Sequence, residues 1–439
     1  MTTIAAELRR LKTSLPDLIA PALIDRCLQR LPHRFRKRIL TPVVIIQLLV
    51  LRVLEANTAY AHLPHLARIP FTPSAFCQAL ARLPLELLQA LLTAVGTQVD
   101  QSPPAAQDLF AGRHRVLLVD GLCLSMPDTP TLAAHFGYPA GQKTGLGFPV
   151  AKLLMLVDLS TGLIRRVLIN PYRTHESSQA SRLHPELQSG DILVGDRGFC
   201  SFVHLALLLG RTCHGVFRAH QRLLWNFAKE LKNQGMQIRI LRSLGRNDRL
   251  IIYRKPQQRP LWISAEDYAQ LPEQITVREL RYRVTRKGFR SRTVMLVTTL
   301  VDPLTYSRNE LARLYGLRWQ IETQFRHLKS TLNMAVLKGK SVGVIEREIL
   351  AYVLVYNLVA REVRRGARTQ DVAPERISFI DAVRWFISGM RAGVPLRINP
   401  LRSGRSEPRV RKRRSVNYPY MTRPRDVLRQ ELMRNSLGK

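Results

Sequence analysis

The stretch from Leu311 to Leu332, LARLYGLRWQIETQFRHLKSTL, places the strongest constraint on how this chain can fold. At about 100° per residue, a single helix here gathers its apolar side chains on one side. Beside them runs a polar stripe of one acid, two bases and a phenol: Glu322, Arg318, Lys329 and Tyr315. Ser307 and Glu310 predict a capping box at the start of this helix. The pattern favours a helix docked on a core, with a site for a metal ion and a phosphate at its rim. The alternative is a solvated helix whose charges pair at i,i+4, as Arg318 and Glu322 can.

Two acidic residues follow apolar segments earlier in the chain. VLLVDG puts Asp120 at the end of a predicted buried strand, and ILVGDRGF puts Asp196 in a glycine-flanked bend after another. Buried carboxylates are costly unless a positive charge compensates them. Mg²⁺ prefers hard oxygen ligands and a nearby phosphate, so two such ions would compensate these acids. Taken singly, each aspartate is more simply explained as a turn residue.

The third polar cluster fits a known motif with every gap, because Tyr315, Arg318, Glu322 and Lys329 read Y-x2-R-x3-E-x6-K. With Asp120 and Asp196 preceding it in order, the chain resembles bacterial insertion-sequence transposases, the DDE enzymes with the Y-R-E-K third motif (the insertion-sequence "four" family). The resemblance covers roughly residues 40 to 365. It implies that Asp120, Asp196 and Glu322 are catalytic and bind two Mg²⁺ ions, with Mn²⁺ as a substitute.

Arg318 and Lys329 cannot bind a cation, so we expect them to contact DNA phosphates. Tyr315 is expected to contact DNA as well, through a sugar or a phosphate. The resemblance implies that the protein nicks DNA at the ends of its insertion sequence and joins them to a target. Many relatives form a hairpin intermediate with a flipped base, and Trp225 or Trp262 could stack on it, although packing in the core is the favoured role for both. His175-Glu176 could assist the site, but a helix start with Glu in its first turn is favoured.

The net charge of +36 indicates a polyanionic partner. Residues 1–110 carry +5 and residues 397–439 carry +10, which leaves +21 on the body of the chain. Double-stranded DNA is therefore the expected partner, and a homodimer is expected in the assembled complex. No membrane association is expected, because the longest apolar run, Val43 to Leu51, is too short to span a bilayer. The N-terminus does not resemble a signal peptide, and five cysteines without CxxC spacing fit a reducing cytosol. We expect a cytoplasmic, nucleoid-associated bacterial protein.

The order of predicted elements indicates an α/β protein with a ribonuclease-H-like catalytic core. Residues 1–106 read as an all-α domain for DNA binding or assembly, in which three short helices suggest a helix-turn-helix unit. The core spans 107–218 and 293–365, with strands at Arg115–Asp120, Ala151–Asp158 and Leu163–Ile169 forming an antiparallel meander. Strands at Asp191–Asp196 and Cys213–Arg218 then alternate with a helix at 202–209.

A β-rich insertion is expected at residues 219–292, with a hairpin around Arg286-Lys287-Gly288. The interval from Asp196 to Glu322 is 126 residues, against 76 from Asp120 to Asp196, and an insertion explains the excess. Residues 366–439 form a basic C-terminal region containing RVRKRR. Two alternative functions remain open: a ribonuclease-H-like nuclease without strand transfer, and a transposase relative that binds DNA without cutting it.

Overall fold

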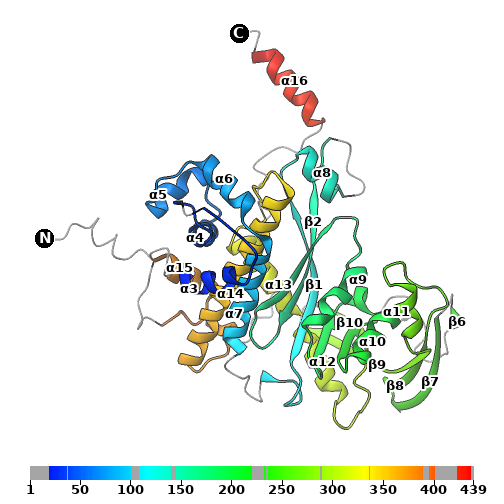
Figure 1. Ribbon diagram of the computed structural model, residues 1–439. Coiled ribbons are helices and arrows are strands. Elements are labelled where there is room, and N and C mark those ends of the chain that lie inside the picture. The colour runs from blue at the N-terminus through cyan, green and yellow to red at the C-terminus, as the bar shows by residue number, and fades with distance from the viewer. Residues whose placement is uncertain are drawn as a thin grey trace.

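A mixed sheet of ten strands organises the molecule, in the order β3-β2-β1-β4-β5-β10-β9-β8-β7-β6. The structure is a computed structural model that describes residues 19–36, 38–100, 108–139, 145–219, 232–233, 236–286, 289–335, 337–388, 395–400 and 423–436. The strands are β1 (Val116–Ser125), β2 (Val150–Asp158), β3 (Ile164–Pro171), β4 (Ile192–Gly195), β5 (His214–Arg218), β6 (Lys232–Asn233), β7 (Met236–Gly245), β8 (Asp248–Arg254), β9 (Gln274–Arg286) and β10 (Phe289–Thr298). Helices cover the sheet, so the fold is mixed α/β (Figure 1).

The first five strands have the predicted arrangement. β1, β2 and β3 pair antiparallel, and β4 and β5 add in parallel beside β1. One expectation was wrong: β1 does not end at Asp120 but continues to Ser125. Its pairing with β2 runs unbroken from Leu117↔Asp158 to Ser125↔Val150, and this supports the extra residues. Asp120 therefore lies within a strand rather than at its end.

The predicted insertion extends the same sheet. β10 pairs with β5 on one side and β9 on the other, and β9 continues to β8 and β7. The pairing of Arg286 with Phe289 fits the predicted hairpin, although Lys287 and Gly288 lie outside the described residues. Buried ion pairs between strands, Arg249 with Glu279 and Arg278 with Asp248, join β8 to β9. Figure 1 shows this extension, with α11 (Ala265–Gln270), on the side of the molecule away from the N-terminal helices.

The described part of residues 19–100 is helical. Its elements are α3 (Pro21–Gln29), α4 (Pro42–Leu54), η1 (Tyr60–His62), α5 (Leu63–Ala67), α6 (Pro73–Arg82) and α7 (Leu85–Asp100). Thr41 and Thr72 cap α4 and α6 with their hydroxyls, and a proline follows each at the first helical position, where its missing N–H costs nothing. Of these, α4, α6 and α7 pack on the long helix α14 (Val342–Thr369), and α3 packs on α4 and α7 within the same hydrophobic core. The predicted domain boundaries themselves stay a prediction.

Alternate residues of β1 face two different cores. Val116 and Leu118 point into the core shared with α14, whereas Leu117 and Val119 point into a second core under α10 (Phe202–Gly210). Shorter elements complete both layers: α8 (Pro130–Phe136), α9 (Glu176–Gln179), η3 (Ala180–Glu186), η4 (Arg197–Phe199), α12 (Arg308–Gly316), α13 (Trp319–Arg326), η6 (His327–Thr331), η7 (Pro374–Arg376) and α15 (Phe379–Ser388). β1 is thus covered from both faces.

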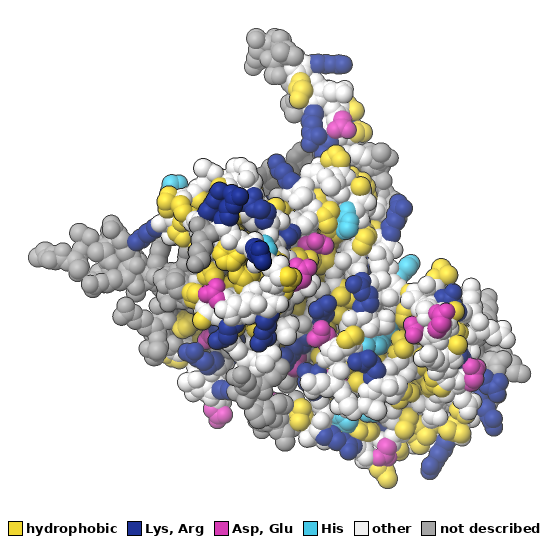
Figure 2. Space-filling view, in the orientation of Figure 1, with side chains coloured by type: hydrophobic (Ala, Val, Ile, Leu, Met, Phe, Trp, Pro, Cys, Tyr) yellow, Lys and Arg dark blue, Asp and Glu magenta, His cyan; other side chains and the backbone are white. Residues whose placement is uncertain are grey.

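Helix α16 (Arg425–Ser436) projects from the body of the molecule (Figure 1). Arg425 at its start pairs with Asp128 at 2.5 Å and lies over the Phe148 ring. RVRKRR lies outside the described residues. Lys and Arg side chains are spread across the face in Figure 2 rather than confined to one end. Among the described residues, no single helix is long and apolar enough to cross a membrane. Only the bent pair Pro73–Arg82 and Leu85–Val99, taken together, has the length and composition that this would need.

Candidate active site

The register between β1 and β4 brings Asp120 and Asp196 together. The last parallel pair is Leu118 with Val194, and each aspartate lies two residues beyond its member of that pair. Past this point β4 ends and η4 begins, so β1 has no strand partner on that edge. The two carboxylates therefore lie at the place where the parallel pair opens, which only the register could reveal.

Backbone N–H groups hold one oxygen of each aspartate. Asp120 Oδ1 accepts from Gly121 N at 2.8 Å, and Asp196 Oδ1 accepts from Gly198 N at 2.7 Å as the N-cap of η4. The predicted bend around Asp196 is this cap. Each carboxylate thereby keeps its second oxygen for another partner.

The predicted single helix from Leu311 to Leu332 was wrong, because the segment is divided into α12, α13 and the π-helical turn η6. Around Leu317 the backbone tightens: Arg318 N bonds to Tyr315 O, and Ile321 N bonds to Arg318 O, each three residues back. The predicted capping box of Ser307 and Glu310 is confirmed. Each change of helix type rotates the side chains that follow, so the uniform 100° phase does not hold across the motif.

Arg318 joins two of the predicted acids. Its Nη1 donates to Asp120 Oδ2 at 2.9 Å, and its Nη2 lies 3.5 Å from Glu322 Oε1. The Arg318 side chain is only 12% exposed, so this is not a solvated surface pair. Burial raises the pKa of Asp120; the Gly121 N–H and Arg318 act against that rise, while Asp196 and Glu322 add to it. Asp120 therefore lies in the electrostatic field of both other acids.

Tyr315 and Lys329 are the other two residues of the motif. Tyr315 is buried in the core, where burial raises the pKa of its phenol, and the Arg318 guanidinium is 5.9 Å from its ring centroid. Lys329, in η6, is half-buried and lies close enough to β1 to act on Cys123. Burial raises the pKa of the Cys123 thiol, and Lys152 and Lys329 act against that rise. The structure thus places all six sequence-predicted residues around the middle and second half of β1.

Glu176 is a neighbour of the acids for which a helix start was the favoured interpretation. It begins α9, as the favoured interpretation predicted, and it also lies beside the acid pair. Burial raises the pKa of Glu176, Lys152 acts against the rise, and Asp120 and Asp196 add to it. The signal available in the sequence was its position just after the third strand, but nothing there showed which way α9 would face.

The three acids are ligands of the right type for a divalent cation, but their side chains are not arranged to hold one in this structure. Carboxylate oxygens are the ligands that Mg²⁺ prefers, and Asp196 and Glu322 both act electrostatically on Asp120. Within the described part of the chain, however, no three acidic, histidine or cysteine side chains converge closely enough to hold an ion. The Arg318 guanidinium pairs with Asp120 and Glu322, so cation binding requires at least a side-chain movement there.

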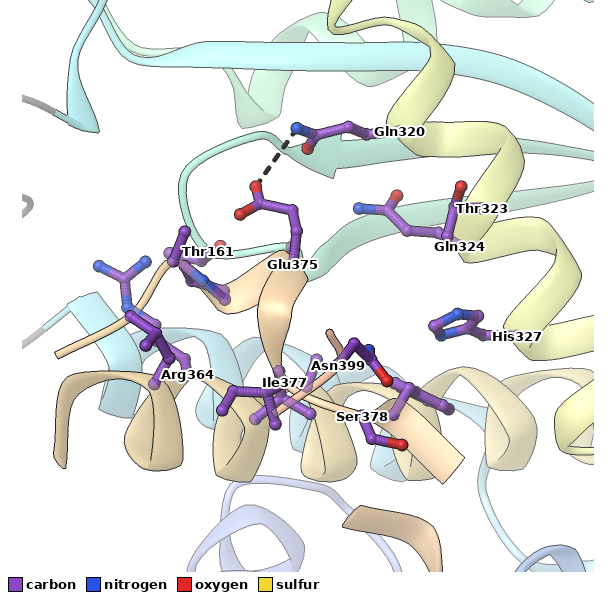
Figure 3. Close-up of a pocket in the computed structure, with 18 of the residues that line it drawn as sticks. Thr161, Gln320, Thr323, Gln324, His327, Arg364, Glu375, Ile377, Ser378 and Asn399 are labelled. Carbon is purple, nitrogen blue, oxygen red and sulfur yellow. Dashed lines mark hydrogen bonds between the residues drawn. The ribbon is translucent and has the colours of Figure 1, made fainter. Parts of the chain in front are cut away.

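The other side of α13 borders a cavity of about 1290 Å³ (Figure 3). Gln320, Gln324 and His327 line it, with the β2–β3 turn and the C-terminal part of α14 opposite, and Gln320 donates to Glu375 at 3.3 Å. The acids Asp120, Asp196 and Glu322 do not line it. Trp262 stacks on His204 at 4.9 Å and packs against the second core, while Trp225 lies outside the described residues.

Comparison with known proteins gives one family, one relative by sequence and similar solved structures. Residues 111–358 match the family model described as "Transposase DDE domain". The chain is 26% identical over 448 residues to the transposase InsG for insertion sequence element IS4 of Escherichia coli (strain K12), covering 94% of each chain. Among solved structures, the piggyBac transposase synaptic complex with hairpin DNA is 10% identical, with a TM-score of 0.44 over 88% of this chain and 80% of that one. The Mos1 transposase paired-end complex is 11% identical, with a TM-score of 0.16 over 42% and 64%.

Proposed function

Because the chain belongs to the family of transposases with a DDE domain, we propose that Asp120, Asp196 and Glu322 are its three catalytic acids. The protein is a DNA transposase of the insertion-sequence type. The observation that carries the assignment is the β1–β4 register, which sets Asp120 beside Asp196, together with the Arg318 contacts that tie Glu322 to the same place. The reaction assigned to it is cleavage at the ends of its own insertion sequence, followed by joining to target DNA.

The three acids would hold two Mg²⁺ ions, with Mn²⁺ as a substitute. When bound, the ions would lower the pKa of the attacking water or 3′-hydroxyl and stabilise the leaving oxygen. The chain's part is to fix the carboxylates: the Gly121 and Gly198 N–H groups orient Asp120 and Asp196 before any ligand arrives.

Arg318, Lys329 and Tyr315 are assigned to the DNA strand. A guanidinium can hold two phosphate oxygens, so Arg318 could exchange its contacts with Asp120 and Glu322 for the scissile phosphate as cations bind the acids. Lys329 extends the positive side of the site beyond Arg318. Tyr315 supports Arg318 through its ring, 5.9 Å from the guanidinium.

We assign residues 107–218 and 293–365 to a ribonuclease-H-like core, which the strand order β3-β2-β1-β4-β5 supports. Residues 219–292 are its β-rich insertion, 1–106 a helical DNA-binding or assembly domain, and 366–439 a basic region. Two copies are expected in the assembled complex with double-stranded DNA, in the bacterial cytoplasm at the nucleoid. The net charge of +36 supports the DNA partner.

A single assay tests the function. Purified protein is incubated with Mg²⁺ or Mn²⁺ and a labelled duplex that carries the inverted repeat flanking its own gene, and products are separated on a denaturing gel. Nicking at the repeat and joined products are expected. Nicking without joining would favour the nuclease alternative, and binding without nicking would favour a relative that no longer cuts.

A further inference from the structure

Glu176 is held in place by contacts on both sides of it. Before it, Lys152 Nζ donates to Thr174 O at 3.0 Å. After it, His204 Nε2 donates to Ser177 O from the buried helix α10. α9 also packs against η4, the turn that Asp196 caps. The start of α9 is therefore fixed relative to both β1 and Asp196.

The carboxylate of Glu176 lies against the backbone of Gly121. A Cβ atom on Gly121 would be 2.2 Å from Glu176 Oε1 and 2.6 Å from Oε2, a distance at which no side chain fits. Gly121 follows Asp120 directly, and by strand alternation the two residues face opposite sides of β1. Because β1 has no strand partner on the edge beyond Leu118, groups from its two faces can meet there.

The surroundings of Glu176 do not neutralise it directly. Among the described residues, no hydrogen-bond donor or cation pairs with its carboxylate; Lys152, the positive charge that acts against its raised pKa, donates to a carbonyl and lies 5.2 Å from the Tyr172 ring. A half-buried carboxylate beside two further carboxylates is costly unless a cation joins them. Gly121 leaves room for this carboxylate because it has no Cβ.

We propose that Glu176 is a fourth acidic residue of the active site, which helps Asp120 and Asp196 to hold the divalent cation from the opposite face of β1. The inference rests on the proposed function, since it assumes that these aspartates bind a cation. Gly121 then has a role as well, because its lack of a side chain lets the Glu176 carboxylate reach the open edge of β1.

The test measures Mn²⁺ binding to the full-length chain without DNA, from the electron paramagnetic resonance signal of free Mn²⁺. Glu176→Gln should weaken Mn²⁺ binding by at least about tenfold, the lower end of what the loss of a residue supporting a metal site costs. The control is Glu186→Gln, on neighbouring η3, where Glu186 makes an exposed pair with Arg166 at 3.8 Å; it should bind Mn²⁺ as the wild type does. Equal Mn²⁺ affinity of Glu176→Gln and wild type would overturn the inference.

Two further measurements separate the possible failures. If Asp120→Asn also binds Mn²⁺ normally, the proposed cation site falls; if only Glu176→Gln binds normally, the triad stands and the role of Glu176 falls. In EDTA, Glu176→Gln should melt at the same temperature as wild type or higher, because an amide removes charge repulsion. A lower melting temperature with unchanged Mn²⁺ binding would assign Glu176 a structural role instead.

Gly121→Ala gives an independent variant that leaves every charge in place. The added methyl group must displace the Glu176 carboxylate, so Mn²⁺ binding should weaken as in Glu176→Gln. In a Glu176→Ala background, where the space is free, the same substitution should add little. An equal loss in both backgrounds would mean that Gly121→Ala acts through Asp120 alone and would remove this support.

Discussion

Arg318 Nη1 donates to Asp120 Oδ2 across 2.9 Å, although the two residues are 198 positions apart in the chain. This contact closes the site across the sheet, from the start of α13 to the middle of β1. It also places a positive charge among the acids, which compensates part of the cost of burying Asp120. Arg318 is therefore both a neighbour of the acids and the residue that must move when they bind a cation.

We predict that Asp120→Asn, Asp196→Asn and Glu322→Gln each abolish cleavage and leave binding of the inverted repeat nearly unchanged. Each replacement keeps the shape of the side chain and removes a charged oxygen ligand. Gel-shift titration and a cleavage assay on the same preparations would check this. Glu273→Gln, a change at an exposed carboxylate of the insertion, is the control and should cleave normally. Near wild-type nicking by any of the three variants would remove that residue from the triad.

Arg318→Ala should slow cleavage strongly and shift its acidic limb to higher pH. The shift is expected because the guanidinium lowers the pKa of Asp120, so its loss lets that carboxyl keep its proton to higher pH. Arg318→Lys should restore little, since an ammonium cannot hold two oxygens as the fork does.

A purely structural ion pair predicts another outcome for Arg318→Ala: a lower free energy of unfolding, because Asp120 and Glu322 lose their positive partner, with unchanged cleavage. Cleavage rates across pH and thermal melting, measured on one sample, distinguish the two. Arg326→Ala, an exposed arginine of α13 whose guanidinium bonds only to Thr323 among the described contacts, serves as the matched control.

Asp120→Asn should stabilise the protein at neutral pH when metal is removed with EDTA. Burial raises the pKa of Asp120 in the folded state above its unfolded value. The stability that the neutral carboxyl contributes is therefore fully present below the unfolded pKa and is lost as pH rises through the folded pKa. Asparagine escapes this loss. The difference in melting temperature between variant and wild type should therefore grow from acidic to neutral pH; a difference independent of pH would contradict the burial argument.

Glu348→Gln should destabilise the fold by roughly 3–5 kcal/mol, because it leaves the Arg52 charge buried without its partner. Arg52 and Glu348 are 1% and 0% exposed and lie 2.9 Å apart, joining α4 to α14. Glu348 also accepts from the backbone N–H groups of Lys338 and Gly339. Urea unfolding measures the effect, with Glu431→Gln at an exposed pair as the control, expected within about 0.5 kcal/mol of wild type.

Truncation after Pro400 should weaken DNA binding chiefly at low salt and reduce the slope of log affinity against log salt, because fewer counterions are released. The cut is placed there since Leu396 is buried against Gly366 and accepts a hydrogen bond from Gln370. Arg425→Ala in the full chain should loosen α16 from Asp128 and keep most of the slope. A truncated chain with the full slope would show that the basic region does not contact the duplex.

Local patterns predicted the first five strands and the helix α10, because alternation and apolar runs are local. The strands at residues 151–158, 163–169 and 213–218 agree with β2, β3 and β5 to within two residues. The length of β1 was missed, since Asp120 and Gly121 are unfavourable in a strand and only pairing with β2 sustains it. The division of the 311–332 helix was missed because hydrophobic phase does not reveal a local change of helix type.

The residues of the candidate site could be chosen from the motif, but their contacts could not. That Arg318 pairs with Asp120 as well as Glu322 depends on how α13 docks on β1, which is a property of the packed core. Glu176 depends likewise on the direction in which α9 leaves β3. Contacts between elements far apart in sequence are set by the whole fold, and no single segment carries them.

The position of β10 has a consequence for how the molecule is made. β5 pairs with β4 on one side and with β10 on the other, and the whole insertion separates β5 from β10 along the chain. Because a ribosome delivers the chain from its N-terminus, β5 has an open edge until residues 289–298 emerge. Open edges are where nascent chains join one another wrongly. During that interval of synthesis the strands that carry Asp120 and Asp196 have emerged, but β10, which pairs with β5, has not. We therefore expect the risk of wrong association between chains to be high at that stage.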